Sequence, residues 1–139
     1  MPEKIEFELV SPEKVLVSQL VDMVVVPGGD GDYGVLGDHI PLITTVRPGA
    51  IAVYEDNHVI DRIFVTGGFA EVTGEKCTVL VETAIPVGKL DRATVEQSVR
   101  NCTEDIEDAK DDEERSKATL QLAIAQAQLQ AIIDAAAGH

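Results

Sequence analysis

Glycine and proline are confined almost entirely to the first two thirds of this chain. All six prolines and ten of the eleven glycines lie at or before Gly88, and the stretch from Lys89 to Ala137 contains neither residue. Proline and glycine shape turns and interrupt helices. Their distribution therefore predicts a turn-rich domain over residues 1–88 and a helical domain over residues 89–139.

The first domain has the hydrophobic spacing of short β-strands. Ile5, Phe7 and Leu9 alternate with glutamates, which is the period of a strand with one solvent-facing side. Further runs rich in β-branched residues follow, separated by turn residues, at 15–26, 43–46, 50–54, 59–65, 69–73 and 77–81. Many short strands without a helix between them predict an antiparallel β-sandwich.

The second domain changes to the hydrophobic period of a helix. One apolar stripe recurs every three or four residues at Val95, Val99, Cys102, Ile106 and Ala109. A second stripe has the same spacing at Leu122, Ala125, Leu129, Ile132 and Ala136. The acidic cluster at 111–114 favours a helix start between them. The predicted fold class is mainly β with α, an N-terminal antiparallel β-sandwich followed by a C-terminal antiparallel α-helical hairpin.

Composition excludes several classes of partner. The formal charge of −14 is shared between the two domains and argues against nucleic acids and anionic lipid surfaces. No run reaches the roughly 18–20 apolar residues of a membrane span, so we expect no direct membrane insertion. The first four residues precede no apolar run, so no secretory signal is expected. Cys77 and Cys102 fit no metal-binding spacing and are expected to be reduced thiols.

A glycine-rich segment at 28–42 is the strongest candidate for a site. A phosphate loop is excluded because Asp30 and Asp32 would repel the phosphate and no lysine follows the glycines. The calcium motifs fail because Gly34 and Tyr33 occupy positions that should carry a ligand. The segment is therefore interpreted as an ordered, specially shaped loop.

The histidines do not suggest an active site. Asp38-His39 could form half of a catalytic pair, but no nucleophile motif accompanies it. His58 and His139 add no metal-ligand spacing. The sequence thus predicts no catalytic residues, no metal site and no cofactor, and it favours a locally bonded surface role for His39.

Three segments, taken in order, resemble one known family. The stretch 31–42, GDYGVLGDHIPL, which leads to the RPG of 47–49, closely resembles the signature of the epsilon subunit of bacterial F-type ATP synthases. LVSPE at 9–13 and FVTGGFAEV at 64–72 are similar to two further segments of that family. The likeness extends over essentially the whole sequence.

The resemblance implies a noncatalytic rotor subunit of the central stalk. It would couple rotation of the c-ring to the gamma subunit of a proton-translocating ATP synthase, from a peripheral position on the cytoplasmic side of the bacterial inner membrane. In that family the sandwich, here residues 1–88, binds gamma and the c-ring, and the hairpin can reach the alpha and beta subunits. The positions that the resemblance assigns to ring or gamma contacts are Asp32, Tyr33, Gly34, His39, Pro41 and Leu42.

Two regulatory features of the family match this sequence poorly. Some members bind ATP through I/L-D-x-x-R-A, and Leu90 and Asp91 match its start, but Thr94 and Val95 stand where Arg and Ala are expected. In many relatives basic residues of the second helix help inhibit ATP hydrolysis, whereas residues 118–139 contain no Lys or Arg. We therefore expect no ATP site and a weak inhibitor.

One alternative from another class stays open at this stage. The same sandwich and hairpin could form a free-standing adaptor protein whose helices bind another helix. Co-purification with an ATPase complex separates this possibility from the rotor subunit. A small enzyme that uses Asp38 and His39 is disfavoured by the missing nucleophile and metal set.

Overall fold

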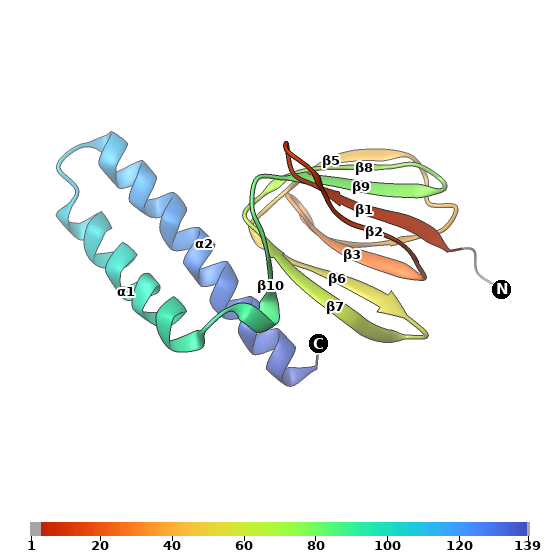
Figure 1. The fold of residues 1–139 in the computed structure, drawn as a ribbon. Coiled ribbons are helices and arrows are strands. Elements are labelled where there is room, and N and C mark those ends of the chain that lie inside the picture. The colour runs from red at the N-terminus through yellow and green to blue at the C-terminus, as the bar shows by residue number, and fades with distance from the viewer. Residues whose placement is uncertain (1–3, 139) are drawn as a thin grey trace. The chain divides into compact units, whose positions relative to one another are not determined.

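The computed structural model describes residues 4–138 and divides into two compact units, which meet in the sequence between Pro86 and Val87. The first unit is a curled β-sheet of ten strands, and the second is a pair of helices (Figure 1). The predicted mainly-β fold class with a C-terminal helical hairpin is therefore confirmed. Met1–Glu3 and His139, which the predicted domains include, lie outside the described residues.

Eight of the ten strands follow the predicted hydrophobic runs. Their bounds are β1 (Ile5–Val10), β2 (Val15–Val21), β3 (Met23–Gly28), β4 (Gly31–Leu36), β5 (Leu42–Val46), β6 (Gly49–Glu55), β7 (His58–Val65), β8 (Gly68–Val72), β9 (Lys76–Val81) and β10 (Ala84–Pro86). The order along the sheet is β10-β7-β6-β3-β5-β8-β9-β1-β2, with β4 paired to β3 alongside this path. Curling brings the two halves of the sheet face to face, and aliphatic side chains fill the space between them (Figure 1).

Alternation of side chains across the sheet explains the core. Phe7 of β1 is paired with Cys77 of β9, and both side chains are fully buried, as is Val79, the partner of Leu9. Side chains at the intervening positions, such as Glu6 and Glu8, point outward and are partly exposed. Strands β1 and β9 thus each contribute every second residue to the interior.

Three details of the sheet differ from the sequence prediction. The run 15–26 forms two strands rather than one, because the main-chain N–H of Asp22 donates to Tyr54 O and its carboxylate accepts from Asp56 N. Strands β4 and β10 were not expected. Strand β1 pairs with β9 in parallel, while every other pair among the described strands is antiparallel.

The helical unit begins with a short 3₁₀ turn, η1 (Val87–Lys89), followed by α1 (Arg92–Asp108) and α2 (Asp112–Ala137). Each helix has an aspartate as its N-cap residue. Asp91 accepts a hydrogen bond from Thr94 N at 3.1 Å, and Asp111 accepts one from Glu114 N at 2.8 Å. The helix start predicted at the acidic cluster 111–114 is therefore confirmed.

The seam between the helices has small side chains at its most buried positions. Val95 is the buried residue of α1, and the buried residues of α2 are Ala118, Ala125 and Ala131. Of the predicted second stripe, Ala125 is buried and Ala136 is exposed. The most deeply buried residues of α2 are thus alanines, and the larger residues Leu122, Leu129 and Ile132 of the predicted stripe are partly buried.

Candidate functional site

A tight hairpin lies at one end of the sandwich. We define the glycine-rich end as Gly28–Asp32 of this hairpin together with Arg47. Strands β3 and β4 pair from Met23 with Leu36 up to Gly28 with Gly31, so that Gly29 and Asp30 form a two-residue turn. A Cβ on Gly28 would lie 2.7 Å from Gly31 O, and one on Gly29 would overlap Thr45 Oγ1. Glycine is therefore required where this turn approaches β5.

Arg47 joins the end of β5 to this hairpin. Its Nη1 donates to Gly28 O at 2.6 Å, and its Nη2 forms an ion pair with Asp32 Oδ1. Its main-chain N–H donates to Pro27 O at 2.9 Å. The predicted contact residue Asp32 thus faces solvent as half of an ion pair.

Tyr33 is held against β5 from the next position of the hairpin. Its hydroxyl lies 2.6 Å from Thr44 Oγ1, and the ring is partly buried. Burial raises the pKa of Tyr33, and the hydrogen bond with Thr44 opposes that shift only in part. A hollow of about 260 Å³ lies beside the ring, bordered by the glycines of the turn and by Ile43, Thr44 and Thr45.

The other predicted contact residues lie elsewhere. Gly34 pairs with Val25 in the middle of the β3–β4 ladder. His39 follows β4, where its main-chain N–H donates to Leu36 O and its Nδ1 lies 2.7 Å from Ile40 O. Pro41 and Leu42 are exposed at the start of β5.

Asp32 and His39 are therefore at opposite ends of β4. Leu36 is four positions along the strand from Asp32, which corresponds to about 13 Å. The structure brings Asp32 and Tyr33 together with Arg47 and Thr44, and it does not bring His39, Pro41 or Leu42 to that end. Sequence reasoning missed Arg47, although it is the only Lys or Arg between Lys14 and Arg62.

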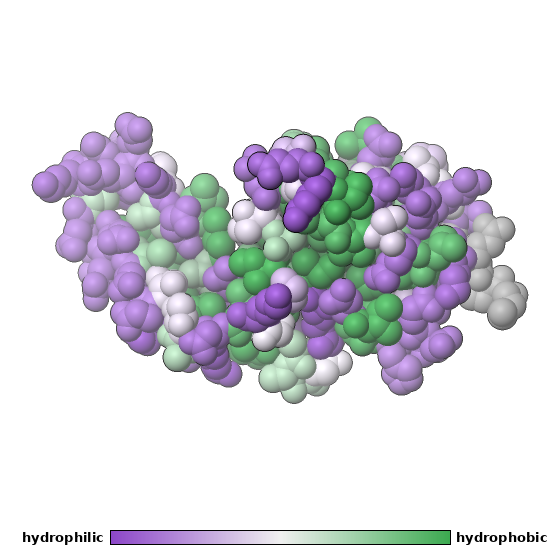
Figure 2. Space-filling view, in the orientation of Figure 1, coloured by the Kyte–Doolittle hydropathy of each residue, from purple (hydrophilic) through white to green (hydrophobic). Residues whose placement is uncertain are grey.

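An outer face of the sheet carries exposed apolar side chains that sequence reasoning did not single out. Phe69 pairs with Leu80, Leu80 with Val10, and Val10 with Val15, so these four residues form a row across β8, β9, β1 and β2. Phe69, Leu80 and Val15 are 59%, 46% and 55% exposed. We call this row the apolar strip, and green hydrophobic residues gather over β1 and β2 in Figure 2.

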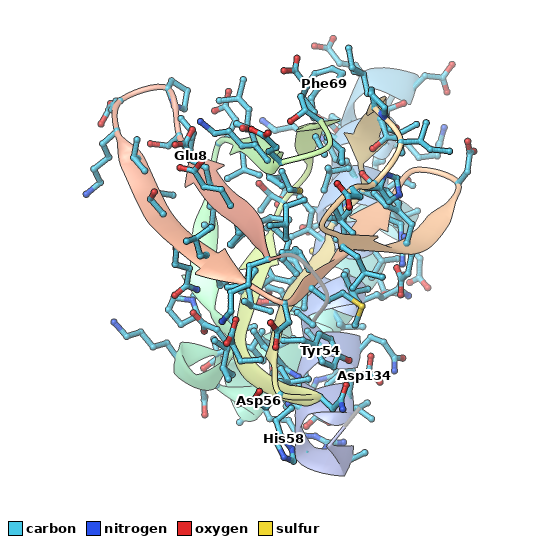
Figure 3. All side chains as sticks on the ribbon, turned by 90° about the vertical axis from the view of Figure 1, so that its right-hand side faces the viewer. Glu8, Tyr54, Asp56, His58, Phe69 and Asp134 are labelled. Carbon is cyan, nitrogen blue, oxygen red and sulfur yellow. The ribbon has the colours of Figure 1, made fainter. Side chains whose placement is uncertain are left out.

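The apolar strip begins next to the glycine-rich end. Thr45 pairs with Phe69, and Thr45 O accepts a hydrogen bond from Gly29 N at 3.0 Å. In Figure 3, Phe69 lies at the top of the sandwich, and Asp56 and His58, which belong to the β6–β7 turn, lie at the bottom. The polar hairpin and the apolar strip therefore form one continuous surface.

At the start of the helical unit, the residues that partly match the family's ATP-binding motif serve as a helix cap. Asp91 accepts from both the main-chain N–H and the hydroxyl of Thr94, at 3.1 and 2.6 Å. These hydrogen bonds lower the pKa of Asp91. Leu90 N donates to Val87 O, and Val95 is buried. The Asp91 carboxylate is thus already paired within its own helix turn.

Comparison with known families decides what kind of protein carries these features. Residues 4–87 match the family described as ATP synthase, Delta/Epsilon chain, beta-sandwich domain, and residues 91–139 match the C-terminal domain of the ATP synthase epsilon subunit family. The ATP synthase epsilon chain of Rhodospirillum centenum is 56% identical over 137 residues, covering 95% of this chain and 94% of that protein. The chain belongs to the ATP synthase epsilon chain family. The epsilon chain of Paramagnetospirillum magneticum, 50% identical, is covered to 99% of its length and matches 95% of this chain.

Solved structures share the fold of this family member. A subunit of the Euglena gracilis mitochondrial ATP synthase structure, which comprises OSCP, F1 and the c-ring, matches with a TM-score of 0.83 at 19% identity, over 99% of this chain and 83% of that one. A subunit from the central stalk and c-ring of the Tetrahymena thermophila mitochondrial ATP synthase matches with a TM-score of 0.65 at 15% identity, over 94% of this chain and 97% of that one.

Family membership confirms the function class predicted from the sequence. The protein is a noncatalytic subunit of a membrane-associated F-type ATP synthase rather than an enzyme or a free-standing adaptor. Among residues 4–138, no helix is both long enough and apolar enough to span a membrane.

Proposed function

We propose that this protein couples rotation of the c-ring to the gamma subunit as part of the central stalk, on the cytoplasmic side of the bacterial membrane. Its relatives are ATP synthase epsilon chains, and the two assemblies described above contain a c-ring. The two partners would bind the continuous surface at the glycine-rich end. The gamma subunit would contact the apolar strip, and the c-ring would contact the polar hairpin.

The apolar strip is the observation that carries this proposal. Phe69, Leu80 and Val15 are each roughly half exposed, although Ala70 and Val79, which are next to Phe69 and Leu80 in β8 and β9, are buried. Contiguous apolar side chains on a solvent-facing surface mark a protein contact. We assign this face to the gamma subunit because a contact that buries the apolar strip would hold the sandwich firmly on gamma as the two rotate together.

The polar part suits the short loops that a membrane ring exposes to water. Asp32 and Tyr33 would contact these loops directly, while Gly34 lets the hairpin lie flat between them. A second contact with the ring would form at the other end of β4. It would involve His39, Pro41 and Leu42, and the exposed side chain of Ile40 adds apolar area there. Transmission of torque needs a stiff body, and the sandwich with its closely packed aliphatic core meets that need.

The hairpin is proposed to inhibit ATP hydrolysis weakly or not at all. No lysine or arginine follows Lys117, so the remainder of α2 has no cation for acidic residues of the alpha and beta subunits. Removing residues 112–139 should raise the ATPase rate of the complex by less than about twofold. A rise of several fold would contradict this part of the proposal.

Binding of ATP by the hairpin is not proposed. The Asp91 carboxylate is paired with Thr94, which occupies the position of the expected arginine. Calorimetric titration of the full-length protein with ATP should give no saturable heat. Tight, saturable binding would overturn this view.

A pull-down with gamma and the c-ring tests the proposal. Changing Phe69 and Leu80 together to Asp places two charges on the apolar strip and should reduce recovery of gamma by at least tenfold, since the contact would bury unpaired carboxylates. Ile60→Asp is the matched control because Ile60 is 52% exposed on β7 and lies outside the apolar strip. Equal recovery of gamma by the unchanged protein and both variants would reject the assignment of the strip.

A further inference from the structure

Arg47 makes more contacts with the β3–β4 hairpin than a turn residue requires. Its guanidinium donates to the Gly28 carbonyl through one nitrogen and pairs with Asp32 through another. Its own main-chain N–H is fixed on Pro27 O, and the neighbouring Thr45 O accepts from Gly29 N. The base of the side chain and its far end are thus both attached to the same hairpin.

We infer that Arg47 is a positioning residue for Asp32 in the contact with the c-ring, and this inference rests on the function proposed above. An aspartate that is 60% exposed would otherwise sample several rotamers, and ordering it on binding would cost entropy. The ion pair removes part of that cost because it selects one orientation before the partner arrives. Asp32 keeps its second oxygen, Oδ2, as an acceptor toward solvent.

The Arg47–Asp32 ion pair also indicates which kind of partner surface fits the hairpin. Asp30 and Asp32 would give the hairpin two negative charges, and Arg47 reduces this to one. The surface then offers a carboxylate oxygen beside unused guanidinium N–H groups. This combination fits a neutral polar loop that presents donors and acceptors together, such as side-chain amides or free main-chain groups, better than it fits a cluster of cations.

Arginine is needed for this geometry, and lysine is a poor substitute. The planar guanidinium reaches the Gly28 carbonyl and the Asp32 carboxylate with different nitrogens, whereas a single ammonium group is a point charge on a flexible stem. The change Arg47→Lys would therefore retain the charge but would lose the orientation of Asp32. This difference separates a positioning role from a general electrostatic one.

A double-mutant cycle in the assembled complex tests the inference. Complexes stripped of this subunit are reconstituted with full-length protein that has Asp32→Asn, Arg47→Gln, both changes, or Arg47→Lys, and binding is measured with and without the c-ring. Asp32→Asn and Arg47→Gln should each weaken ring-dependent binding by about three- to tenfold, and the double variant should be no weaker than either single one. Arg47→Lys should recover less than half of the loss.

Lys4→Gln is the control because Lys4 also pairs with an acid, Glu55, at the opposite end of the sandwich. It should bind as the unchanged protein does, and thermal melting of all variants should show folded protein. Additive losses in the double variant, full recovery with Arg47→Lys, or an unimpaired Arg47→Gln beside an impaired Asp32→Asn would overturn the inference alone. An unimpaired Asp32→Asn would reject the ring contact itself, and the inference with it.

Discussion

Phe7, Leu9 and Ile51 are at most 1% exposed inside the sandwich, whereas the residues buried in the helical unit are Val87, Val95 and three alanines. A buried alanine contributes a single methyl group, worth about 0.8 kcal/mol, against about 1.5–3 kcal/mol for a valine, leucine, isoleucine or phenylalanine. The two units therefore differ greatly in how firmly their packing holds them together. A stiff sandwich can transmit force, while a hairpin whose fully buried residues are mostly alanines separates at a smaller cost.

The largest expected effect is in the sandwich core. Phe7→Ala should lower the free energy of unfolding of the sandwich by about 3–5 kcal/mol, because it leaves a cavity between fully buried side chains. Urea denaturation followed by circular dichroism measures the loss. If the full-length protein with Phe7→Ala does not fold, Phe7→Leu should still cost about 1 kcal/mol or more. A loss near zero for either variant would mean that the core is looser than its burial indicates.

The two cysteines give a chemical comparison of the units. Burial raises the pKa of the Cys77 thiol to about 12, whereas Cys102 is partly exposed beside a hollow of about 430 Å³ between the helices. At pH 8 iodoacetamide should modify Cys102 in the folded protein and leave Cys77 unmodified until the sandwich unfolds. Mass spectrometry of the modified peptides distinguishes the two sites. Equal rates of modification at Cys77 and Cys102 would contradict the difference in burial between the two thiols.

The same thiol predicts a sensitivity to alkali. Because the pKa of Cys77 is higher in the folded than in the unfolded protein, where it is about 8.5, its contribution to stability is complete below about pH 8.5. This contribution is lost as the pH rises through about 12. The raised pKa of Tyr33 acts in the same direction. Cys77→Val should make the unfolding midpoint less dependent on pH between about 9 and 11, and an unchanged dependence would contradict this.

A smaller effect is expected at the seam of the hairpin. Ala125→Leu inserts a large side chain between the helices and should destabilise the hairpin by about 1–3 kcal/mol. Ala123→Leu, on an exposed position of the same helix, is the matched control and should be close to neutral. Thermal melting followed by circular dichroism compares the two, and equal melting curves would show that α2 does not use Ala125 for packing.

The smallest predicted effect is at the start of α1. Asp91→Ala removes the cap on Thr94 N and should lower the melting temperature of the hairpin slightly, whereas Asp108→Ala at the other end of the helix should not. The pKa of Asp91 is lowered in the folded protein, so the cap is fully effective above about pH 4 and is lost as the pH falls through the folded pKa. The difference between the two variants should therefore be largest near about pH 7 and should shrink as the pH falls through the folded pKa of Asp91.

Local patterns in the sequence were sufficient for most of the fold. The period of the apolar residues predicted seven of the strand runs and both helices, and the acidic cluster at 111–114 marked the start of α2. Strand β4 was missed because glycine density at 28–37 resembles a loop, although pairing with the valines of β3 makes it a strand. The break at Asp22 depends on a hydrogen bond to Asp56, 34 residues away, which no local pattern reveals.

The candidate site was predicted only in part for the same reason. Asp32 and Tyr33 lie where a contact surface is expected, but the unrecognised strand β4 places His39 about 13 Å or more from Asp32. Arg47 was treated as part of a turn because its partner is 15 residues earlier in the sequence. The apolar strip depends on strand order, which brings Val10 beside Leu80 through a parallel pair.

ATP-driven proton pumping tests the central claim most directly, because it reports whether the sandwich alone couples the rotor. Complexes that lack this subunit are reconstituted in vesicles with the full-length protein, with a variant ending at Gly88, or with full-length protein that has both Phe69→Asp and Leu80→Asp. The truncated variant should restore pumping to at least half of the level given by the full-length protein, and the double variant should restore almost none. Pumping that is lost with the hairpin and retained by the double variant would contradict the account.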